Sequence, residues 1–419
     1  MALEIVFDCP RTRKRLQNGP LGWLLEGFCA WLLEHGFSRY SIRKHLAGVS
    51  HLNEYLEKSG AGSRAVLTSD DIDRFFQAYP LWCRHQGPLE KHLRRARYTI
   101  NRFTSYLRTE TLFEARPRQV HYQRLLDTYL DWMRRYQHAA DGTLQVRAHS
   151  LEQFLRWLGP EASLQELQGL TPERVENFFL ACARKLGRAA RRSMQSALRT
   201  FFRFCLYQGY IQRPLDRAVP TLRTYKLSGV PRGLTDDQAQ HVLKCINRTT
   251  TAGRRDYAII QMLYTYGVRG VQLRILRLED IDWVQNHLLF RAVKQGKNIR
   301  VPLTPAVGES LLDYLRNSRP RCLARQVFLT CRPVYQPLPN SNSLSAIVAR
   351  CIRAAGIEVS HQGAHAFRHC FATRMLKEGY SLKAIADVLG HRCLGTTFIY
   401  TKVDINNLKQ VALDWPQGV

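Results

Sequence analysis

HAFRHCFATRML, residues 365–376, and LGHRCLGTTFIYTKV, residues 389–403, are the stretches that decide the fold of this 419-residue chain. Apolar residues recur at helical spacing around them, and His365 and Arg368, three apart, share one helix face. Upstream, YTYGVRGVQL (264–273) places an Arg just after an apolar helix. HLLFRAVKQGKNIRVPL (287–303) predicts two short strands around KQGK. We therefore expect this region to be mainly α with a small β-sheet.

Together these segments resemble the tyrosine recombinase, or phage integrase, family. Any one fragment would be weak evidence, but their order and spacing agree: Arg269 to Lys294 is 25 residues, Arg269 to Arg368 is 99, Arg368 to His391 is 23, and His391 to Tyr400 is 9. The match covers about 190 residues, and it implies an α+β catalytic domain of that family.

The chemistry of cutting a phosphodiester without a metal matches the residue types present. Tyr400 supplies a hydroxyl of ordinary pKa about 10, which must be activated by nearby cations and a base. Arg269 and Arg368 supply planar forks that can bind the two non-bridging oxygens of a phosphate. The product implied by the resemblance is a 3′-phosphotyrosine, which another strand's 5′-hydroxyl can reseal.

The resemblance also implies roles for three further residues. His365 is the candidate general base for Tyr400, His391 would donate a hydrogen bond to the scissile phosphate, and Lys294 would act as general acid for the departing 5′-oxygen. Lys297 is a rival to Lys294, but the interval from Arg269 favours Lys294.

Two simpler interpretations compete with these assignments, and one residue departs from the family pattern. Standing alone, Tyr400 would be taken as a core aromatic residue. His361, His365 and His369 are spaced four apart, but HAFRH lacks the Glu of H-E-x-x-H, so neither a metal nor a cofactor is predicted. Gln272 stands where the family commonly carries an acidic residue. An amide accepts a hydrogen bond but adds no negative charge, which leaves the orientation of Arg269 open.

Charge points to the partner. Lys and Arg number 62 against 34 Asp and Glu, a formal net charge of +28. The excess is +5 over residues 1–115, +8 over 116–222 and +15 over 223–419. Because it is spread along the whole chain, it indicates a protein that wraps or clamps a polyanionic partner, most often nucleic acid, with its body rather than with a basic tail, although a basic solvated surface without a partner would have the same charge. The resemblance implies that this partner is double-stranded DNA.

A weak internal repeat with a period near 100 residues predicts two N-terminal helical bundles, similar to the SAM-like modules of the family. SHLNEYLEK (50–58) matches HSLEQFLRW (149–157), and LTSDDIDRFF (67–76) matches LTPERVENFF (170–179). An Arg-rich helix near Arg94 matches another near Arg188. The predicted domains are a DNA-binding module of arm- or core-binding type (1–115), a core-binding module (116–222), a linker (223–232) and the catalytic domain (233–419).

The helix expected from Arg188 to Tyr207 has one apolar side and one cationic side. Its apolar residues are Met194, Ala197, Leu198, Phe201 and Cys205. Its candidate DNA-binding residues are Arg188, Arg192, Arg199 and Arg203. A plain solvated helix surface would have a similar pattern.

The expected function is therefore site-specific DNA recombination, for integration, excision or transposition of a mobile element. Exchange between two duplexes needs four active sites, so we expect a homo-tetramer on DNA, with other recombinases or directionality factors as further candidate partners. The tail 404–419 either docks on a neighbour or covers its own domain. Two rivals remain at this point: a type IB topoisomerase and a non-catalytic DNA-binding accessory protein.

The cellular compartment is inferred from cysteines and from hydropathy. Eleven cysteines without a C-x-x-C pair predict free thiols in a reducing compartment. The first twenty residues do not have the order of a secretory signal, and no apolar stretch approaches the roughly 18 residues of a membrane span. We expect a cytoplasmic, nucleoid-associated protein that does not engage a membrane.

Overall fold

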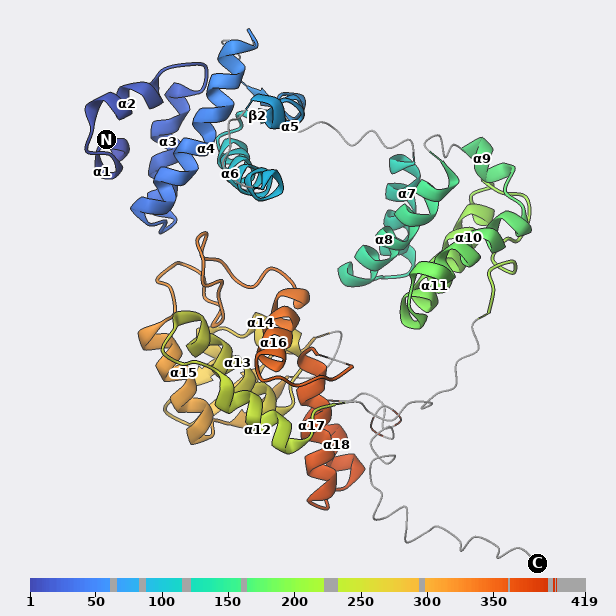
Figure 1. The fold of residues 1–419 in the computed structure, drawn as a ribbon. Coiled ribbons are helices and arrows are strands. Elements are labelled where there is room, and N and C mark those ends of the chain that lie inside the picture. Colours follow the sequence, from blue (N-terminus) through green and yellow to red (C-terminus); the bar gives the residue numbers. More distant parts are fainter. Residues whose placement is uncertain are drawn as a thin grey trace, which may run out of the picture. The chain divides into compact units, whose positions relative to one another are not determined.

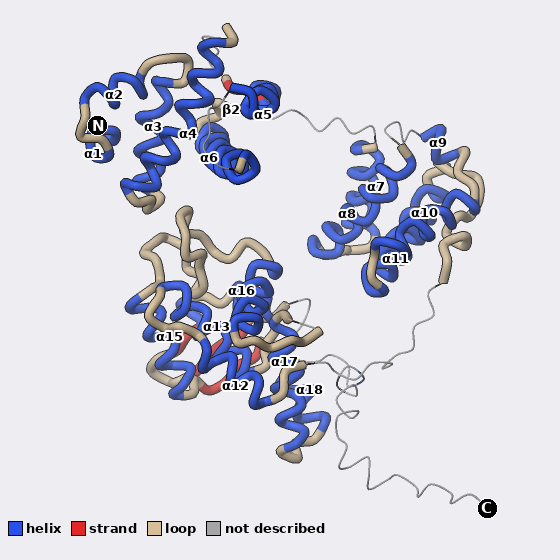
Figure 2. Tube along the Cα trace, in the orientation of Figure 1, coloured by secondary structure: helices blue, strands red, loops and turns tan. Residues whose placement is uncertain are grey.

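The computed structural model describes residues 1–60, 66–82, 88–114, 122–159, 164–221, 233–293, 298–360 and 362–390, together with 395 and 397. Helices make up most of these residues, and the strands are few and short (Figures 1 and 2). The chain divides into two compact units, one formed by Met1–Ala115 with Gly229–Val419 and the other by Arg116–Ser228. The prediction of a mainly α protein with a small sheet is confirmed.

The N-terminal module is a helical bundle with its own apolar core, which includes Leu25, Phe28, Leu46 and Phe103. Its helices are α1 (Ala2–Val6), α2 (Pro10–Gln17), α3 (Gly22–Glu34), α4 (Arg39–Lys58), α5 (Ser69–Trp82) and α6 (Leu89–Thr109). Two strands that we did not predict, β1 (Leu67–Thr68) and β2 (Phe113–Glu114), pair in parallel.

The second module forms a separate core around Tyr129, Phe154 and Phe201. Its helices are α7 (Gln123–Tyr136), α8 (Asp141–Leu158), α9 (Leu164–Gln168), α10 (Pro172–Lys185) and α11 (Arg188–Tyr207). Helix α11 has the predicted bounds, and every apolar residue assigned to its packed side is buried.

The two modules repeat the same helices, as the sequence predicted. Helices α3, α4, α5 and α6 correspond in order and length to α7, α8, α10 and α11. Two predicted positions are wrong. Helix α6 begins at Leu89 rather than near Arg94. Helix α4 begins at Arg39 and α8 at Asp141, so these helices correspond at a shift of 102 residues, whereas the matched sequences gave 99. Three residues are close to one helical turn, so both registers place apolar residues on the same face.

In the described part of the C-terminal domain, the helices are α12 (Asp236–Cys245), α13 (Thr251–Tyr266), α14 (Gly270–Ile275), α15 (Pro305–Asn317), α16 (Ser341–Ala354), α17 (Ala364–Lys377) and α18 (Leu382–Leu389), with a 3-10 turn, η1, at Leu278–Asp280. Helices α12 to α17 pack around a third core, which includes Ile259, Leu311, Phe328 and Phe367, while α18 packs against α17 in a smaller cluster with Phe371, Ile385 and Leu389. The Thr235 hydroxyl accepts from the backbone N–H of Gln238 and caps α12, as predicted.

A small antiparallel sheet in this domain has the order β3-β4-β5. Its strands are β3 (Ile281–Asp282), β4 (His287–Phe290) and β5 (Ile299–Pro302). The hairpin of β4 and β5 is the one predicted around KQGK, and β3 is an addition that the sequence did not reveal. The Tyr266 hydroxyl donates to the Pro302 carbonyl at 2.7 Å, which ties α13 to the end of β5.

The described ranges show the state of the cysteines, the hydropathy of the helices and the grouping of potential metal ligands. The nine cysteines within them are unpaired, and three of these, Cys9, Cys245 and Cys322, are exposed. Across the same residues, no helix combines the length and apolarity needed to cross a membrane. The described part also contains no cluster of three His, Cys, Asp or Glu side chains placed to hold a metal ion.

Candidate active site

Arg269 lies at a sharp junction between two helices. Helix α13 ends at Gly267, whose φ of 57° is left-handed, and α14 begins after Arg269. The buried Gln272 turns back along α14, and its Oε1 accepts from the backbone N–H of Arg269 at 3.0 Å. The amide at the position where the family commonly has an acid therefore fixes the main chain of Arg269.

Arg368 lies in the middle of α17 and is only 4% exposed. Its Nη1 donates to the Gly267 carbonyl at 2.9 Å, and its Nη2 donates to the Leu389 carbonyl at 2.7 Å. Burying a guanidinium is costly unless acceptors surround it, and these carbonyl oxygens meet that requirement. Arg368 therefore joins the end of α13 to the end of α18.

The guanidinium of Arg269 also contacts the end of α18. Its Nη1 donates to the Leu389 carbonyl at 3.4 Å, and its Nη2 donates to the Gly390 carbonyl at 3.1 Å. Burial lowers the pKa of Arg269. The structure thus brings together two predicted site residues that lie 99 positions apart in the sequence.

Gly390 makes this approach possible. Its φ of 61° and ψ of 46° are left-handed, and it ends α18. A Cβ at this position would lie 2.9 Å from Ile299 Cδ1 and 3.7 Å from Arg269 Nη1. Only glycine adopts this backbone without strain and leaves room for both neighbours. Gly390 of the predicted L-G-H motif therefore allows Ile299 and Arg269 to lie close to the end of α18.

His365 is the second residue of α17, one turn before Arg368. It is exposed, whereas Arg368 is buried. An imidazole at the rim of a buried guanidinium can meet a bound substrate from the solvent side. Its predicted position on the same helix as Arg368 is confirmed, while its role as general base stays a prediction.

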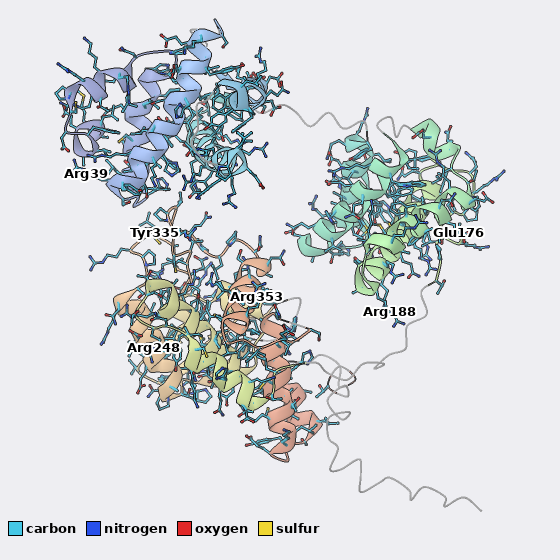
Figure 3. All side chains as sticks on the ribbon, viewed as in Figure 1. Arg39, Glu176, Arg188, Arg248, Tyr335 and Arg353 are labelled. Atoms are coloured by element: carbon cyan, nitrogen blue, oxygen red, sulfur yellow. The ribbon has the colours of Figure 1, made fainter. Side chains whose placement is uncertain are left out.

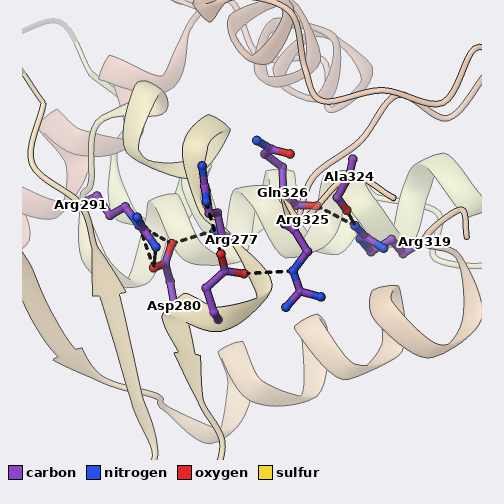
Figure 4. Close-up of polar contacts among 8 residues, drawn as sticks. Arg277, Asp280, Arg291, Arg319, Ala324, Arg325 and Gln326 are labelled. Carbon is purple, nitrogen blue, oxygen red and sulfur yellow. Dashed lines mark hydrogen bonds and ion pairs between the residues drawn. The ribbon is translucent and has the colours of Figure 1, made fainter. Parts of the chain in front are cut away.

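The end of β4, where the chain enters the loop of the hairpin, is held by an ionic contact that the sequence did not reveal (Figure 4). Just after β4, Arg291 donates through Nε to the carboxylate of the buried Asp280, at 2.9 and 3.1 Å. Asp280 also accepts from the backbone N–H of Arg277 at 2.9 Å, which closes the turn of η1. Eleven residues separate Asp280 from Arg291, and no local pattern links them.

Three predicted catalytic residues, Lys294, His391 and Tyr400, lie outside the described residues, as do Lys297 and His361. Their assignment continues to rest on the sequence. The described part of the site consists of Arg269, Arg368 and His365 with the supports given above.

The cationic side of α11 divides into two pairs. Arg188 and Arg192 are exposed near the beginning of the helix, and Arg188 is labelled in Figure 3. Arg199 donates to the Val219 carbonyl at 2.9 Å and to the Thr221 hydroxyl at 2.7 Å.

Arg203 forms the second pair together with Arg199, and it donates through Nε to Asp216 at 2.9 Å. Arg199 and Arg203 therefore also anchor the segment that follows α11, a contact the helical pattern could not reveal. DNA binding by all four arginines stays a prediction.

Comparison with known proteins agrees with this geometry. Residues 232–407 match the model of the phage integrase family. A Sinorhizobium fredii protein named "Putative integrase/recombinase y4rA" is 31% identical over 408 residues, covering 96% of both chains. Tyrosine recombinase XerC of Oceanobacillus iheyensis is 28% identical over 292 residues, 68% of this chain and 93% of XerC.

Among solved structures, the fold is similar to that of the XerH site-specific recombinase in its post-cleavage complex with palindromic difH, with a TM-score of 0.54, 20% identity, and coverage of 70% of this chain and 84% of XerH. The relatives favour neither the topoisomerase nor the accessory-protein alternative. Resemblance over nearly the whole length, together with two arginines converging at the predicted site, places this chain in the phage integrase family, the tyrosine-type site-specific DNA recombinases.

Proposed function

We propose that this recombinase cuts and rejoins duplex DNA through a 3′-phosphotyrosine, with Tyr400 as the nucleophile. The observation that carries the proposal is the shared contact of Arg269 and Arg368 with the Leu389 carbonyl. Leu389 is eleven residues before Tyr400 in the sequence, and the contacts of both guanidinium groups are with Leu389 and Gly390.

In the proposed reaction, Arg269 and Arg368 bind the non-bridging oxygens of the scissile phosphate and stabilise the charge that grows on them. The Tyr400 oxygen bonds to phosphorus as the bond to the 5′-oxygen breaks. The phenolic proton passes to His365, and Lys294 gives a proton to the departing 5′-oxygen. His391 donates a hydrogen bond to the phosphate. Attack by another 5′-hydroxyl reverses these steps and reseals the strand.

DNA binding is assigned to the basic surfaces of the predicted domains 1–115, 116–222 and 233–419. The net charge of +28 supports contact with many phosphates. On α11, the exposed Arg188 and Arg192 would contact the backbone, while Arg199 and Arg203 would do so from anchored positions. The proposed assembly is a homo-tetramer on two duplexes in the nucleoid, serving the integration, excision or transposition of a mobile element.

The decisive test is covalent trapping. Wild-type protein is incubated with sheared genomic DNA and denatured, and the attached fragments are sequenced to find the site. A duplex of that site, nicked beside the cleavage position, should then give a covalent adduct with wild-type protein and none with Tyr400→Phe. An adduct with the Phe variant would overturn the assignment of Tyr400. Efficient relaxation of a supercoiled plasmid that lacks the site would instead indicate topoisomerase activity.

The tail has its own test. Deleting residues 406–419 should leave binding to one site intact and abolish pairing of two sites if the tail docks on a neighbour. Unfolding of the truncated protein would show instead that the tail covers its own domain.

A further inference from the structure

The N-terminal module repeats the second module in its side-chain contacts as well as its helices. Phe28 packs edge-on against Phe103 at 5.1 Å between ring centroids, and Tyr129 packs edge-on against Phe201 at 5.4 Å. Four further ring pairs correspond in the same way: Phe28–Trp31 with Tyr129–Trp132, Phe28–Tyr106 with Tyr129–Phe204, Trp31–Tyr106 with Trp132–Phe204, and Phe103–Tyr106 with Phe201–Phe204. The correspondence holds at shifts of 101 residues for α3 with α7 and 98 for α6 with α11.

The ends of the equivalent helices α6 and α11 agree as well. The N–H of Leu112 donates to the Leu107 carbonyl at 2.7 Å, and that of Tyr210 donates to the Cys205 carbonyl at 2.8 Å, again 98 residues apart. Both turns contain a left-handed residue, Thr111 in the first and Gly209 in the second. The helix packing that presents α11 in the second module therefore presents α6 in the first.

The contact between the second and fourth helices differs in chemistry at matching positions. In the second module, Arg147 of α8 donates to the Ser196 hydroxyl of α11 at 2.8 Å. In the first, the equivalent residues are His45 of α4 and Tyr98 of α6, whose rings lie 5.5 Å apart. The contact joins the same two helix faces in both modules, but its cation is replaced in the first by a neutral aromatic pair.

Cations are instead placed around this pair, on what we call the α4–α6 face: Tyr40, Lys44, Arg95, Tyr98 and Arg102. Lys44 lies over the Tyr40 ring at 4.1 Å, and Arg102 lies over the Tyr98 ring at 5.4 Å. Arg95 lies one turn before Tyr98 on α6 and therefore shares its face. The pKa of Tyr40 is lowered by a hydrogen bond from Lys44 and by the charges of Lys44 and Arg95. The two tyrosines are 68% and 49% exposed.

Acidic residues are missing from this face. Residues 39–53 and 91–109 contain no Asp or Glu, although 91–109 carries six Lys and Arg. Arg39 and Arg43, elsewhere on α4, pair with Asp8. In the described ranges, by contrast, no carboxylate forms an ion pair with Lys44, Arg95 or Arg102. A face that combines cations without carboxylate partners and exposed tyrosines is complementary to phosphate oxygens.

We propose that the α4–α6 face is the part of the basic surface of residues 1–115 that binds the phosphate backbone of a duplex DNA segment. This inference rests on the proposed function, since it assumes that DNA is the substrate, and it assigns specific residues to that contact. The repeated fold supplies a matching pair of helices, and these cations supply the affinity.

The test measures the salt dependence of binding to a fluorescein-labelled duplex of fixed arbitrary sequence, using the full-length chain. The variant Lys44→Ala, Arg95→Ala, Arg102→Ala removes three charges from the face. The matched control Arg11→Ala, Lys14→Ala, Arg15→Ala removes three exposed charges of α2, which packs against α3. The slope of log Kd against log salt should fall by about two to three for the face variant and stay unchanged for the control.

Equal slopes in the two variants would overturn the inference, and a solvated helix surface would then be the correct interpretation. Arg102 is half-buried, so its truncation to Ala removes packing as well as charge. The variant Lys44→Gln, Arg95→Gln, Arg102→Gln is therefore measured beside the Ala variant, and the unfolding temperature of each is compared with that of the wild-type protein. Covalent trapping of the same protein preparations on sheared genomic DNA separates the two hypotheses. Wild-type protein that forms no adduct there contradicts the recombinase mechanism but leaves the slopes readable, whereas an adduct with equal slopes contradicts only the α4–α6 face.

Discussion

Arg269 and Arg368 donate to one carbonyl oxygen, that of Leu389, at 3.4 and 2.7 Å. Leu389 is the last residue of α18, where helix carbonyls lack partners within the helix and carry the negative end of the helix dipole. That helix end therefore attracts both guanidinium groups and holds them side by side. The same two forks are the groups that a scissile phosphate would require.

Replacing Arg269 should damage the chemistry far more than the binding. We expect Arg269→Ala to lower the rate of adduct formation by about 10²–10³-fold or more, because one charge-stabilising fork is lost, while Kd for the duplex changes less than tenfold. The measurements are single-turnover trapping and fluorescence anisotropy. Arg277→Ala is the control, since Arg277 is half-exposed and pairs with Glu279. Equal losses in rate and binding would contradict a catalytic role for Arg269.

Gly390→Ala should impair both stability and cleavage. The left-handed φ of 61° costs an alanine about 1–2 kcal/mol, and the new methyl meets Ile299 beside Arg269. Gly356→Ala provides the comparison, because Gly356 has a φ of 69° but open space around it. Denaturant unfolding should show a lower free energy of unfolding for both variants. Covalent trapping should show lost cleavage only for Gly390→Ala. Normal cleavage by Gly390→Ala would show that this approach to Arg269 is not needed.

Gln272 should act through the hydrogen bond its side chain accepts. Gln272→Glu keeps an acceptor for the backbone N–H of Arg269 and should retain cleavage, whereas Gln272→Ala should lose about 1–2 kcal/mol of stability and slow adduct formation. Chemical denaturation and trapping of both variants provide the measurements. An unaffected Ala variant would show that the cap is dispensable.

Asp280 is expected to position the hairpin that carries Lys294. Asp280→Ala frees Arg291 at the end of β4 and should slow cleavage by tenfold or more if Lys294 is the general acid. A substrate with sulfur in place of the bridging 5′-oxygen has a leaving group that needs no proton, so it should restore the rate. Failure of the sulfur substrate to rescue cleavage would contradict this role. Arg325→Ala, which breaks only an exposed pair with Glu279, is the control.

The N-terminal module should be sensitive to acid through His45. Burial is the main cause that lowers the pKa of His45 from 6.5 to about 4, with Arg102 contributing. The unfolded chain therefore binds this proton more readily, so the stability contributed by neutral His45 is present above pH 6.5 and is lost as pH falls towards 4. The total loss is up to about 3 kcal/mol.

His45→Phe should remove this component, because phenylalanine keeps the ring but has no site to protonate. The difference between wild-type and variant unfolding free energies, measured from pH 7 to pH 4, isolates it from the other histidines. A constant difference across that range would show that His45 is not the group responsible.

The sequence by itself determined the features that depend on neighbours three or four residues apart. Helix α11 has the predicted bounds, Thr235 caps α12, and the strands on either side of KQGK pair, because helical periodicity, capping and the pairing of strands close in sequence are local. The order and spacing of the motifs also identified the family, since those intervals are preserved along the chain whatever its conformation.

Tertiary structure alone decided where side chains meet over long separations. The convergence of Arg269 and Arg368 on Leu389, the Asp280 anchor of Arg291, and the contact of Arg199 with Val219 join positions that no periodicity connects. The predicted register between α4 and α8 was wrong by three residues, because a shift of about one turn preserves the apolar face. Such contacts depend on how the elements pack in three dimensions, and a one-dimensional pattern does not contain that information.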